Sequence, residues 1–248
     1  MTDLLAAVIT LDPLRPGELD PFQGRAMHAL CLDLVRQADP AAAARLHDSD
    51  GLKPFTSSNL IGLRPPAAAR CVAVQPGSLL RWRITTFDPA LTALWLDRVL
   101  PSLPATLTVG DLELAVRGCT TDPAADPAAG LSSYAALVQR HTLGPRHPAP
   151  WINLRFTSPT TFHSQGVHVP LPIPGLMLGH WLEKWNAFAP LTLDPDVRRV
   201  AEQEVVVNRY DLHTEPVQFG PATGHAAATL IGFTGQCSLA IRNSRARA

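Results

Sequence analysis

Residues 78–99 of this 248-residue chain run SLLRWRITTFDPALTALWLDRV. Residues 78–87 have the character of a strand, and the alternation Arg81-Trp82-Arg83 places both arginines on one face of it. Asp88-Pro89 is a helix-start signal, and leucine and tryptophan side chains follow it at helical spacing up to Val99. The stretch therefore predicts a strand that leads directly into an amphipathic helix.

The residues around this stretch supply more elements of both kinds. Strands are expected at 4–10, at 55–61 and at 107–116, the last with a turn at Gly110-Asp111. A first helix is expected to open with Asp20 as its N-cap, and a short second helix to run from Asp39-Pro40 to His47. The order strand, helix, strand, strand, helix, strand is that of a ferredoxin-like, or RRM-like, unit.

Residues 122–130 carry two Asp-Pro pairs and no apolar periodicity, which predicts a linker between a domain at 1–121 and a domain at 131–248. In the second domain we expect helices at 132–140 and 175–188, and strands at 151–156, 204–212, 226–233 and 235–241. These elements suit a second, degenerate ferredoxin-like domain, although the two halves share no clear repeat. The expected fold class is α+β with tandem ferredoxin-like domains.

The composition indicates a globular protein, with 46% hydrophobic and 17% charged residues. The formal net charge is zero, so the overall basic charge typical of a nucleic-acid binder is missing and any RNA site must rest on local clusters. Four scattered cysteines without a CxxC pair favour reduced thiols over a disulfide framework or a zinc site. No apolar run reaches the ~20 residues of a membrane span, and the first residues lack a signal peptide's positive charge. We therefore expect a cytoplasmic protein with no membrane partner.

The segment 45–56, RLHDSDGLKPFT, carries the clearest chemical signal. His47 stands at the expected end of a helix, and Lys53 follows it just before a strand. Imidazole exchanges protons near neutral pH, and an ammonium group stabilises charge that develops on a phosphate. The simpler alternative is that His47 only places a favourable charge at a helix C-terminus. None of the nine histidines has the partner spacing of a metal site, so we expect neither a metal nor a cofactor.

Four groups of residues, taken in order, resemble motifs of the CRISPR-associated repeat-processing endoribonucleases, the Cas-six family of the RAMP superfamily. They are GRAMHAL at 24–30; LHD at 46–48 with KPFT at 53–56; FTSPTTF at 156–162 with the proline-rich loop 170–174 and KWN at 184–186; and IGFTG at 231–235. Each motif is short, and the resemblance rests on their joint order and spacing across nearly the whole chain.

The resemblance implies two ferredoxin-like domains and metal-independent cleavage of CRISPR precursor RNA within its repeats, which yields mature guide RNA. In that reaction a 2′-hydroxyl attacks the adjacent phosphate and leaves a 2′,3′-cyclic phosphate and a 5′-hydroxyl. The implied partners are CRISPR repeat RNA, subunits of a CRISPR interference complex and a second copy of the chain in a homodimer. No cofactor is implied.

The resemblance also suggests roles for individual residues. His47 is the favoured group for proton transfer, Lys53 its electrostatic partner and His28 a second acid or base. The alternative for His28 is a half-buried helix position, because apolar residues lie on its side of the helix. The expected RNA-binding residues are basic side chains and two glycines: Arg25, Arg45, Arg81, Arg83, Arg155, Lys184, Arg209, Gly232 and Gly235. A solvated surface for the arginines and sheet packing for the glycines are the simpler alternatives.

Two other functions stay open at this point. A non-catalytic RAMP subunit that binds guide RNA would share the fold and the glycines without needing His47 and Lys53. An unrelated ferredoxin-like protein with a small-molecule ligand is favoured by the neutral charge. The only tyrosines, Tyr134 and Tyr210, are distant in sequence from both candidate histidines, so no catalytic tyrosine is expected.

Overall fold

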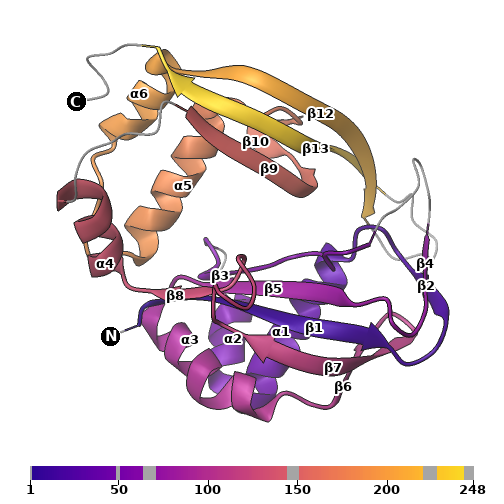
Figure 1. The fold of residues 1–248 in the computed structure, drawn as a ribbon. Coiled ribbons are helices and arrows are strands. Elements are labelled where there is room, and N and C mark those ends of the chain that lie inside the picture. Colours follow the sequence, from indigo (N-terminus) through magenta and orange to yellow (C-terminus); the bar gives the residue numbers. More distant parts are fainter. Residues whose placement is uncertain (1, 49–50, 64–70, 144–150, 220–227, 243–248) are drawn as a thin grey trace. The chain divides into compact units, whose positions relative to one another are not determined.

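A computed structural model describes residues 2–48, 51–63, 71–143, 151–219 and 228–242 of the chain. The chain forms two compact units, Met1–Gly144 and Pro145–Ala248. Each unit combines antiparallel strands with helices (Figure 1), which confirms the predicted α+β class.

Unit 1 contains a six-stranded antiparallel sheet in the order β3-β5-β1-β7-β6, with β8 also paired to β1. Its strands are β1 (Leu4–Pro13), β3 (Phe55–Ser57), β5 (Leu80–Thr86), β6 (Thr106–Val109), β7 (Leu112–Thr120) and β8 (Gly130–Ser132). If β1, β3, β5 and β7 are taken as the four strands of the predicted unit, the first and third lie in the centre and the second and fourth flank them. This is the ferredoxin-like order. The predicted turn at Gly110, whose φ is +61°, joins β6 to β7.

Helices cover one face of this sheet (Figure 1). They are α1 (Gly24–Ala38), α2 (Pro40–Asp48) and α3 (Pro89–Leu94), the last continued by the helical turns Trp95–Val99 and Leu100–Ser102. Two predicted helix starts are confirmed. Asp39 Oδ1 accepts a hydrogen bond from Ala42 N at 2.9 Å, and Asp88 Oδ1 accepts one from Leu91 N at 2.8 Å.

The start of α1 differs from the prediction. Asp20 Oδ1 accepts from Phe22 N at 2.7 Å and so caps a tight turn, and the helix begins only at Gly24. The buried Gln23 side chain donates to the carbonyl of Asp20, and its Oε1 accepts from Leu60 N at 3.2 Å. A tertiary contact from a segment 37 residues away therefore sets the start of this helix.

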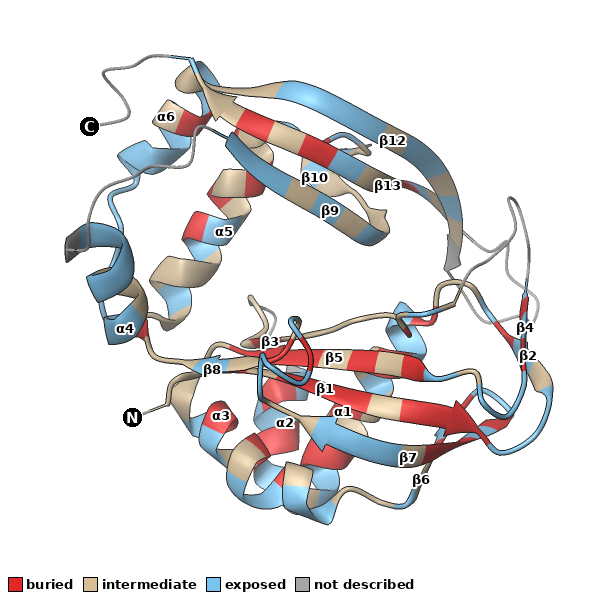
Figure 2. Cartoon of the chain, viewed as in Figure 1, coloured by how far each residue is buried: buried red, intermediate tan, exposed pale blue. Residues whose placement is uncertain are grey.

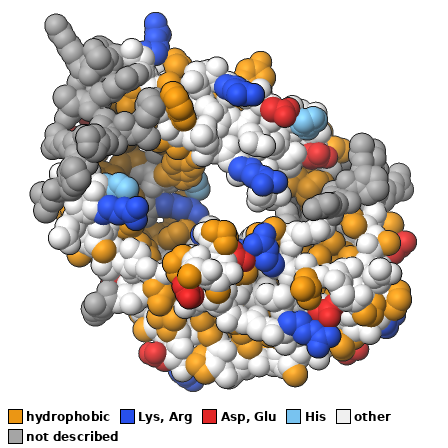
Figure 3. Space-filling model, in the orientation of Figure 1, with side chains coloured by type: hydrophobic (Ala, Val, Ile, Leu, Met, Phe, Trp, Pro, Cys, Tyr) orange, Lys and Arg blue, Asp and Glu red, His pale blue; other side chains and the backbone are white. Residues whose placement is uncertain are grey.

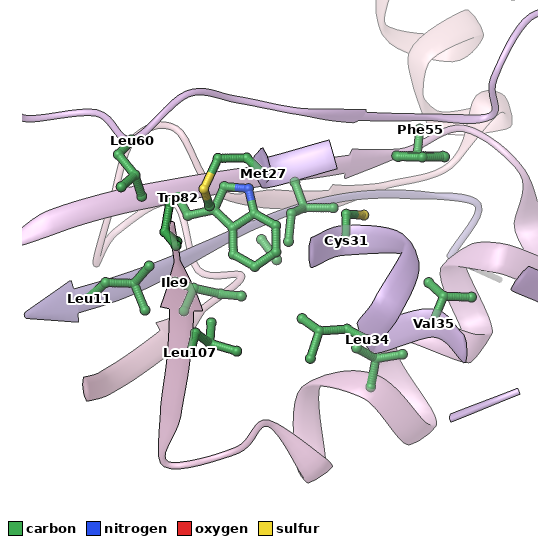
Figure 4. Close-up of a cluster of buried hydrophobic side chains, with 14 of the residues drawn as sticks. Ile9, Leu11, Met27, Cys31, Leu34, Val35, Phe55, Leu60, Trp82 and Leu107 are labelled. Atoms are coloured by element: carbon green, nitrogen blue, oxygen red, sulfur yellow. The ribbon is translucent and has the colours of Figure 1, made fainter. Parts of the chain in front are cut away.

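The core of unit 1 lies between the sheet and the helices. Trp82 of β5, Ile9 of β1 and Met27 of α1 are fully buried, and Figure 4 shows side chains from these three elements within one cluster. Figure 2 shows the buried residues of this unit concentrated along the strands and the adjoining helices. The alternation along β5 sends Trp82 into the core and leaves Arg81 and Arg83 on the opposite face, as the sequence predicted.

The predicted linker 122–130 lies against this opposite face of the unit 1 sheet. Asp126 Oδ2 accepts from Arg81 Nη1 at 2.7 Å, and the backbone oxygen of Ala128 accepts from Arg83 Nε at 2.7 Å. Strand β8 then pairs with the start of β1. The helix α4 (Tyr134–Val138) and the helical turn Gln139–Leu143 also belong to unit 1, so the division falls after Gly144, later than the boundaries at 121 and 131.

Unit 2 is built on a three-stranded antiparallel sheet in the order β12-β13-β9. Its elements are β9 (Trp151–Thr160), β10 (Phe162–Ser164), β11 (Val167–Val169), α5 (Pro174–Phe188), α6 (Asp196–Glu204), β12 (Val205–Phe219) and β13 (Ala228–Ile241). Met177 of α5 packs with Cys237 and Leu239 of β13 in a small core. Three strands and few fully buried side chains agree with a degenerate ferredoxin-like domain.

Besides strand β8 and the β10–β11 hairpin, two features had no counterpart in the sequence prediction. One is α6, which packs on α5 at Gly175 and Gly179; a Cβ there would run into the side chains of Glu202 and Arg198, respectively. The other is a two-stranded sheet of β2 (Gly17–Leu19) with β4 (Val72–Val74), whose three-residue strands are too short to show a period. No helix of the described segments is long and apolar enough to cross a membrane.

Candidate active site

His28 lies in the second turn of α1, beside the buried Met27. Its ring stacks on Phe55, the first residue of β3, with centroids 5.0 Å apart and an angle of 22° between the planes. Phe55 is only 3% exposed, so it gives the imidazole a fixed apolar support. His28 itself is half-buried, which leaves part of the ring accessible to a substrate.

Lys53 connects the end of α2 to the start of β3. Its Nζ donates to the backbone oxygen of Leu46 at 2.7 Å and lies 3.4 Å from that of His47. These carbonyls belong to the last turn of α2, where a cation is favoured by the helix dipole. The His47 side chain is exposed in the same turn, so both residues of the predicted pair meet at one helix end.

The pKa of His28 is lowered, first because burial disfavours the charged imidazolium and second because Lys53 repels it. Lys53 thus links the two predicted catalytic histidines: its charge acts on His28, and its ammonium group contacts the backbone of the turn that carries His47. Phe55, which holds His28, was missed, although its place in the KPFT motif beside Lys53 was visible in the sequence.

This arrangement offers a neutral imidazole, a second and exposed imidazole, and a fixed cation. In-line transesterification of RNA needs a base near the 2′-oxygen, an acid near the 5′-oxygen and positive charge at the phosphate. The two imidazoles can act as the base and the acid, and the ammonium group of Lys53 can supply the positive charge. Among the described residues, no group of three or more His, Cys, Asp or Glu side chains is placed to hold a metal ion.

The predicted RNA-binding residues of unit 1 divide into two groups. Arg25 and Arg45 are exposed on α1 and α2, the helices that carry His28 and His47. Arg81 and Arg83 lie on the sheet face away from these helices and bind the segment 122–130. Burial there lowers the pKa of Arg83. The fold thus separates this second pair from the His28–Lys53 cluster.

In unit 2, Arg155 of β9 and Arg209 of β12 project from the sheet face that points away from the core. Their cross-strand partners on β13 are Gln236 and Ser238, which flank the core residue Cys237. Both arginines are exposed, and neither guanidinium has a hydrogen bond or ion pair with any other described residue. Figure 3 shows the lysine and arginine side chains in separate small groups, in keeping with the zero net charge.

Lys184 lies one turn after His180 on α5, and both are half-buried. Burial lowers the pKa of Lys184 and is also the main cause of the lowered pKa of His180, to which the charge of Lys184 adds. His180 was not among the predicted residues. On the expected helix 175–188, His180 and Lys184 are four positions apart and therefore lie on one face. This spacing was the signal that could have marked His180 as a neighbour of the predicted RNA-binding residue Lys184.

The two predicted glycines of β13 meet packing demands. A Cβ on Gly232 would lie 2.8 Å from Pro159 Cβ on β9, and Gly235 has a φ of +121°. Close strand packing therefore accounts for both glycines, and contact of this segment with RNA stays a prediction. Tyr134 is structural as well: its hydroxyl donates to the backbone oxygen of Phe87 at 2.6 Å, and burial raises its pKa to about 12.

Comparison with protein families assigns both units. The family CRISPR Cas6 N-terminal domain matches residues 5–139, more than half of the chain, and the family CRISPR-associated endoribonuclease Cas6 matches residues 154–247. The chain belongs to the Cas6 family. No curated protein matches it.

Solved Cas6 structures share the fold. A product complex of Cas6 (TTHB231) from Thermus thermophilus is 26% identical over 100% of this chain and 88% of its own, with a TM-score of 0.74. A product complex of Cas6 (TTHA0078) is 25% identical over 100% of this chain and 87% of its own, with a TM-score of 0.70. A Cas6-related protein from Pyrococcus furiosus, 10% identical with a TM-score of 0.60, shares the fold alone.

Proposed function

We propose that this Cas6 protein cleaves CRISPR precursor RNA within its repeats and releases mature guide RNA. The reaction is metal-independent: the 2′-hydroxyl before the scissile bond attacks the phosphate, which forms a 2′,3′-cyclic phosphate and expels a 5′-hydroxyl. The substrate is CRISPR repeat RNA, in line with the Cas6 product complexes among the related structures. The product then passes to a CRISPR interference complex, and a homodimer is the expected oligomer.

One observation carries this proposal. Lys53 contacts the last turn of α2, which holds His47, and its charge acts on the pKa of His28. A scaffold subunit that only holds guide RNA would have no need for two histidines beside a positioned lysine. The arrangement therefore favours the nuclease over the non-catalytic RAMP subunit.

We assign the roles from the environment of each group. His47 is exposed and transfers a proton to or from the substrate, and Lys53 stabilises the charge on the phosphate. His28 is the second group: its lowered pKa keeps the imidazole neutral near pH 7, so it is ready to accept a proton. Histidine and lysine suffice for this chemistry, so no cofactor is invoked.

The RNA is held by the exposed basic residues. Arg25 and Arg45 are the nearest in sequence to the two histidines and are expected to bind phosphates next to the scissile bond. Arg155 and Arg209 of unit 2, together with the half-buried Lys184, bind other parts of the repeat. Arg81 and Arg83 have a lesser part, because each already donates to the segment 122–130.

The test is cleavage, in excess EDTA, of the CRISPR repeat RNA encoded with this protein. Wild type is compared with His47→Ala and His28→Ala, with His213→Ala as the matched control, since His213 is an exposed histidine of unit 2. A substrate with a single 2′-deoxy nucleotide before the scissile phosphate should resist cleavage.

Cleavage in EDTA that the 2′-deoxy substitution blocks would support the mechanism, and the inactive variant would identify the histidine. RNA that is bound and left intact would favour the scaffold subunit. A protein that neither binds nor cleaves the repeat would contradict the proposed substrate.

A further inference from the structure

The hairpin of β10 and β11 brings together two histidines that the proposed function does not use. His163 and His168 are direct cross-strand partners, and both side chains are exposed. Their ring centroids lie 5.1 Å apart, with 63° between the ring planes. The sequence spacing alone does not reveal this pair, because the strand register decides which residues of β10 and β11 face each other.

The turn of the hairpin fixes the two rings on one side. Gln165 and Gly166 both have positive φ, 52° and 79°, as a two-residue type I′ turn requires. On the inward side Phe162 packs toward Phe233 of the core, with ring centroids 6.4 Å apart. Because successive side chains of a strand alternate, the two imidazoles point outward, away from this core.

We propose that this imidazole pair is a binding site for one divalent transition-metal ion of the Zn²⁺, Ni²⁺ and Cu²⁺ class. Such ions take imidazole nitrogen at about 2.0–2.1 Å, and water can complete the coordination. With the nitrogen roughly 1 Å from its ring centroid, two imidazoles on a tetrahedral ion hold their centroids roughly 5 Å apart. The observed 5.1 Å matches that spacing, so rotation of the side chains alone can direct one nitrogen of each ring to a shared ion.

The same geometry argues against a second pair of catalytic histidines. An acid and a base that act on one phosphate must each approach a different oxygen to about 3 Å, with the phosphate between them. Here the ring centroids are only 5.1 Å apart, which is too close for a phosphate between the two rings. A single ion with two nitrogen ligands suits the space.

The ion would link β10 to β11, and this stabilisation of the hairpin would extend to the core of unit 2. Phe162 of this hairpin packs beside Phe233, which adjoins Gly232 in β13. Because the ion binds only where both strands are in register, it should raise the melting temperature of the native protein. It has no part in cleavage, so the site is independent of the proposed nuclease function.

The test is calorimetric titration of the tag-free full chain with Ni²⁺, for wild type, His163→Asn, His168→Asn and the control His213→Asn. His213 is exposed on β12 opposite Thr234, so it has no histidine across the strand. Wild type and the control should bind one ion more than either hairpin variant, or bind it at least about tenfold more tightly. Ni²⁺ should raise the melting temperature of the wild type and of the control alone.

Equal titrations of wild type and both hairpin variants would overturn the proposal, as would loss of binding in only one of them. Equal melting temperatures in EDTA show that the variants fold. As a second measurement, substoichiometric Cu²⁺ should broaden the imidazole NMR signals of both hairpin histidines together; broadening of one alone would also overturn it. Cleavage of repeat RNA in EDTA should be the same in all four proteins, so a failed nuclease assay does not bear on this result.

Discussion

The main sheets of the two units carry strand arginines that look alike in sequence and have different roles. In unit 1, Arg81 and Arg83 donate to a carboxylate and a carbonyl of the segment 122–130. In unit 2, Arg155 and Arg209 are exposed and have no such partner among the described residues. The two pairs differ in whether another described segment of their own unit bonds to them, and only tertiary structure reveals that.

Lys53 extends the comparison to a third kind of cation. It is fixed by backbone carbonyls, as Arg83 is, but these carbonyls belong to the helix that carries His47, and the charge of Lys53 acts on His28. A fixed cation next to acid–base groups can act on a reaction because its position costs no reorganisation. We therefore expect Lys53 to matter for the rate, Arg155 and Arg209 for affinity, and Arg81 for stability.

The largest effect is expected for Lys53→Met. Loss of a positioned positive charge at the phosphate should lower the single-turnover cleavage rate by roughly 10²–10³-fold. The affinity for repeat RNA should change little, because the exposed arginines stay in place. A filter-binding assay beside the cleavage assay separates the two quantities. If RNA binding weakened while the cleavage rate stayed unchanged, Lys53 would act on affinity, as Arg155 and Arg209 are expected to do. The distinction drawn between Lys53 and these arginines would then be wrong.

The next effect is expected for the double variant Arg155→Ala, Arg209→Ala. If both guanidiniums bind phosphates, the slope of log affinity against log salt should become shallower by roughly 0.7 for each contact to single-stranded RNA. The melting temperature should stay as in the wild type, since neither side chain is bonded within the described fold. An unchanged salt slope would mean that this sheet face is not an RNA surface.

A smaller effect is expected for Arg81→Ala, which should change the stability of the protein and not its RNA binding. It removes the hydrogen bond to Asp126, whose side chain is 10% exposed against 43% for Arg81. A bond of this kind contributes about 1 kcal/mol or less, which corresponds to a few degrees in melting temperature. The salt slope of RNA binding should not change. If instead the slope falls and the melting temperature holds, Arg81 binds RNA and the segment 122–130 does not cover it in solution.

Local signals in the sequence predicted what local chemistry determines. The caps at Asp39 and Asp88 and the alternation along β5 are decided within a few residues, and the structure has them as expected. The contact of Lys53 with the backbone oxygen of His47 could also be predicted, because the two residues are only six positions apart in the sequence.

Contacts between distant segments could not be predicted in this way. Asp126 lies 45 residues from Arg81, and Leu60 lies 37 residues from the Gln23 side chain that sets the start of α1. The pairing of His163 with His168 depends on the strand register, which no short motif specifies.

The smallest effect concerns the pKa of His28 and tests how closely Lys53 is coupled to it. Burial is the first cause of the lowered pKa and repulsion by Lys53 the second. In Lys53→Met the repulsion is gone and the burial stays, so the pKa should rise and yet remain below the ordinary value of about 6.5. NMR titration of the imidazole measures this directly, with Arg45→Ala as a control that removes a positive charge of α2 and leaves Lys53 and His28 in place.

The same pKa sets two pH dependences in the wild type. The unfolded chain binds a proton at His28 more readily than the folded chain, so the stability contribution of this residue should decline as pH falls through about 6.5. If His28 is the base, the acidic limb of the cleavage rate should lie below that pH, because the folded imidazole stays neutral further into acid. An acidic limb at or above pH 6.5 would mean that a group other than His28 must be neutral for cleavage. His28 would then serve as a stacked support on Phe55, and Lys53 would act through the end of α2 alone.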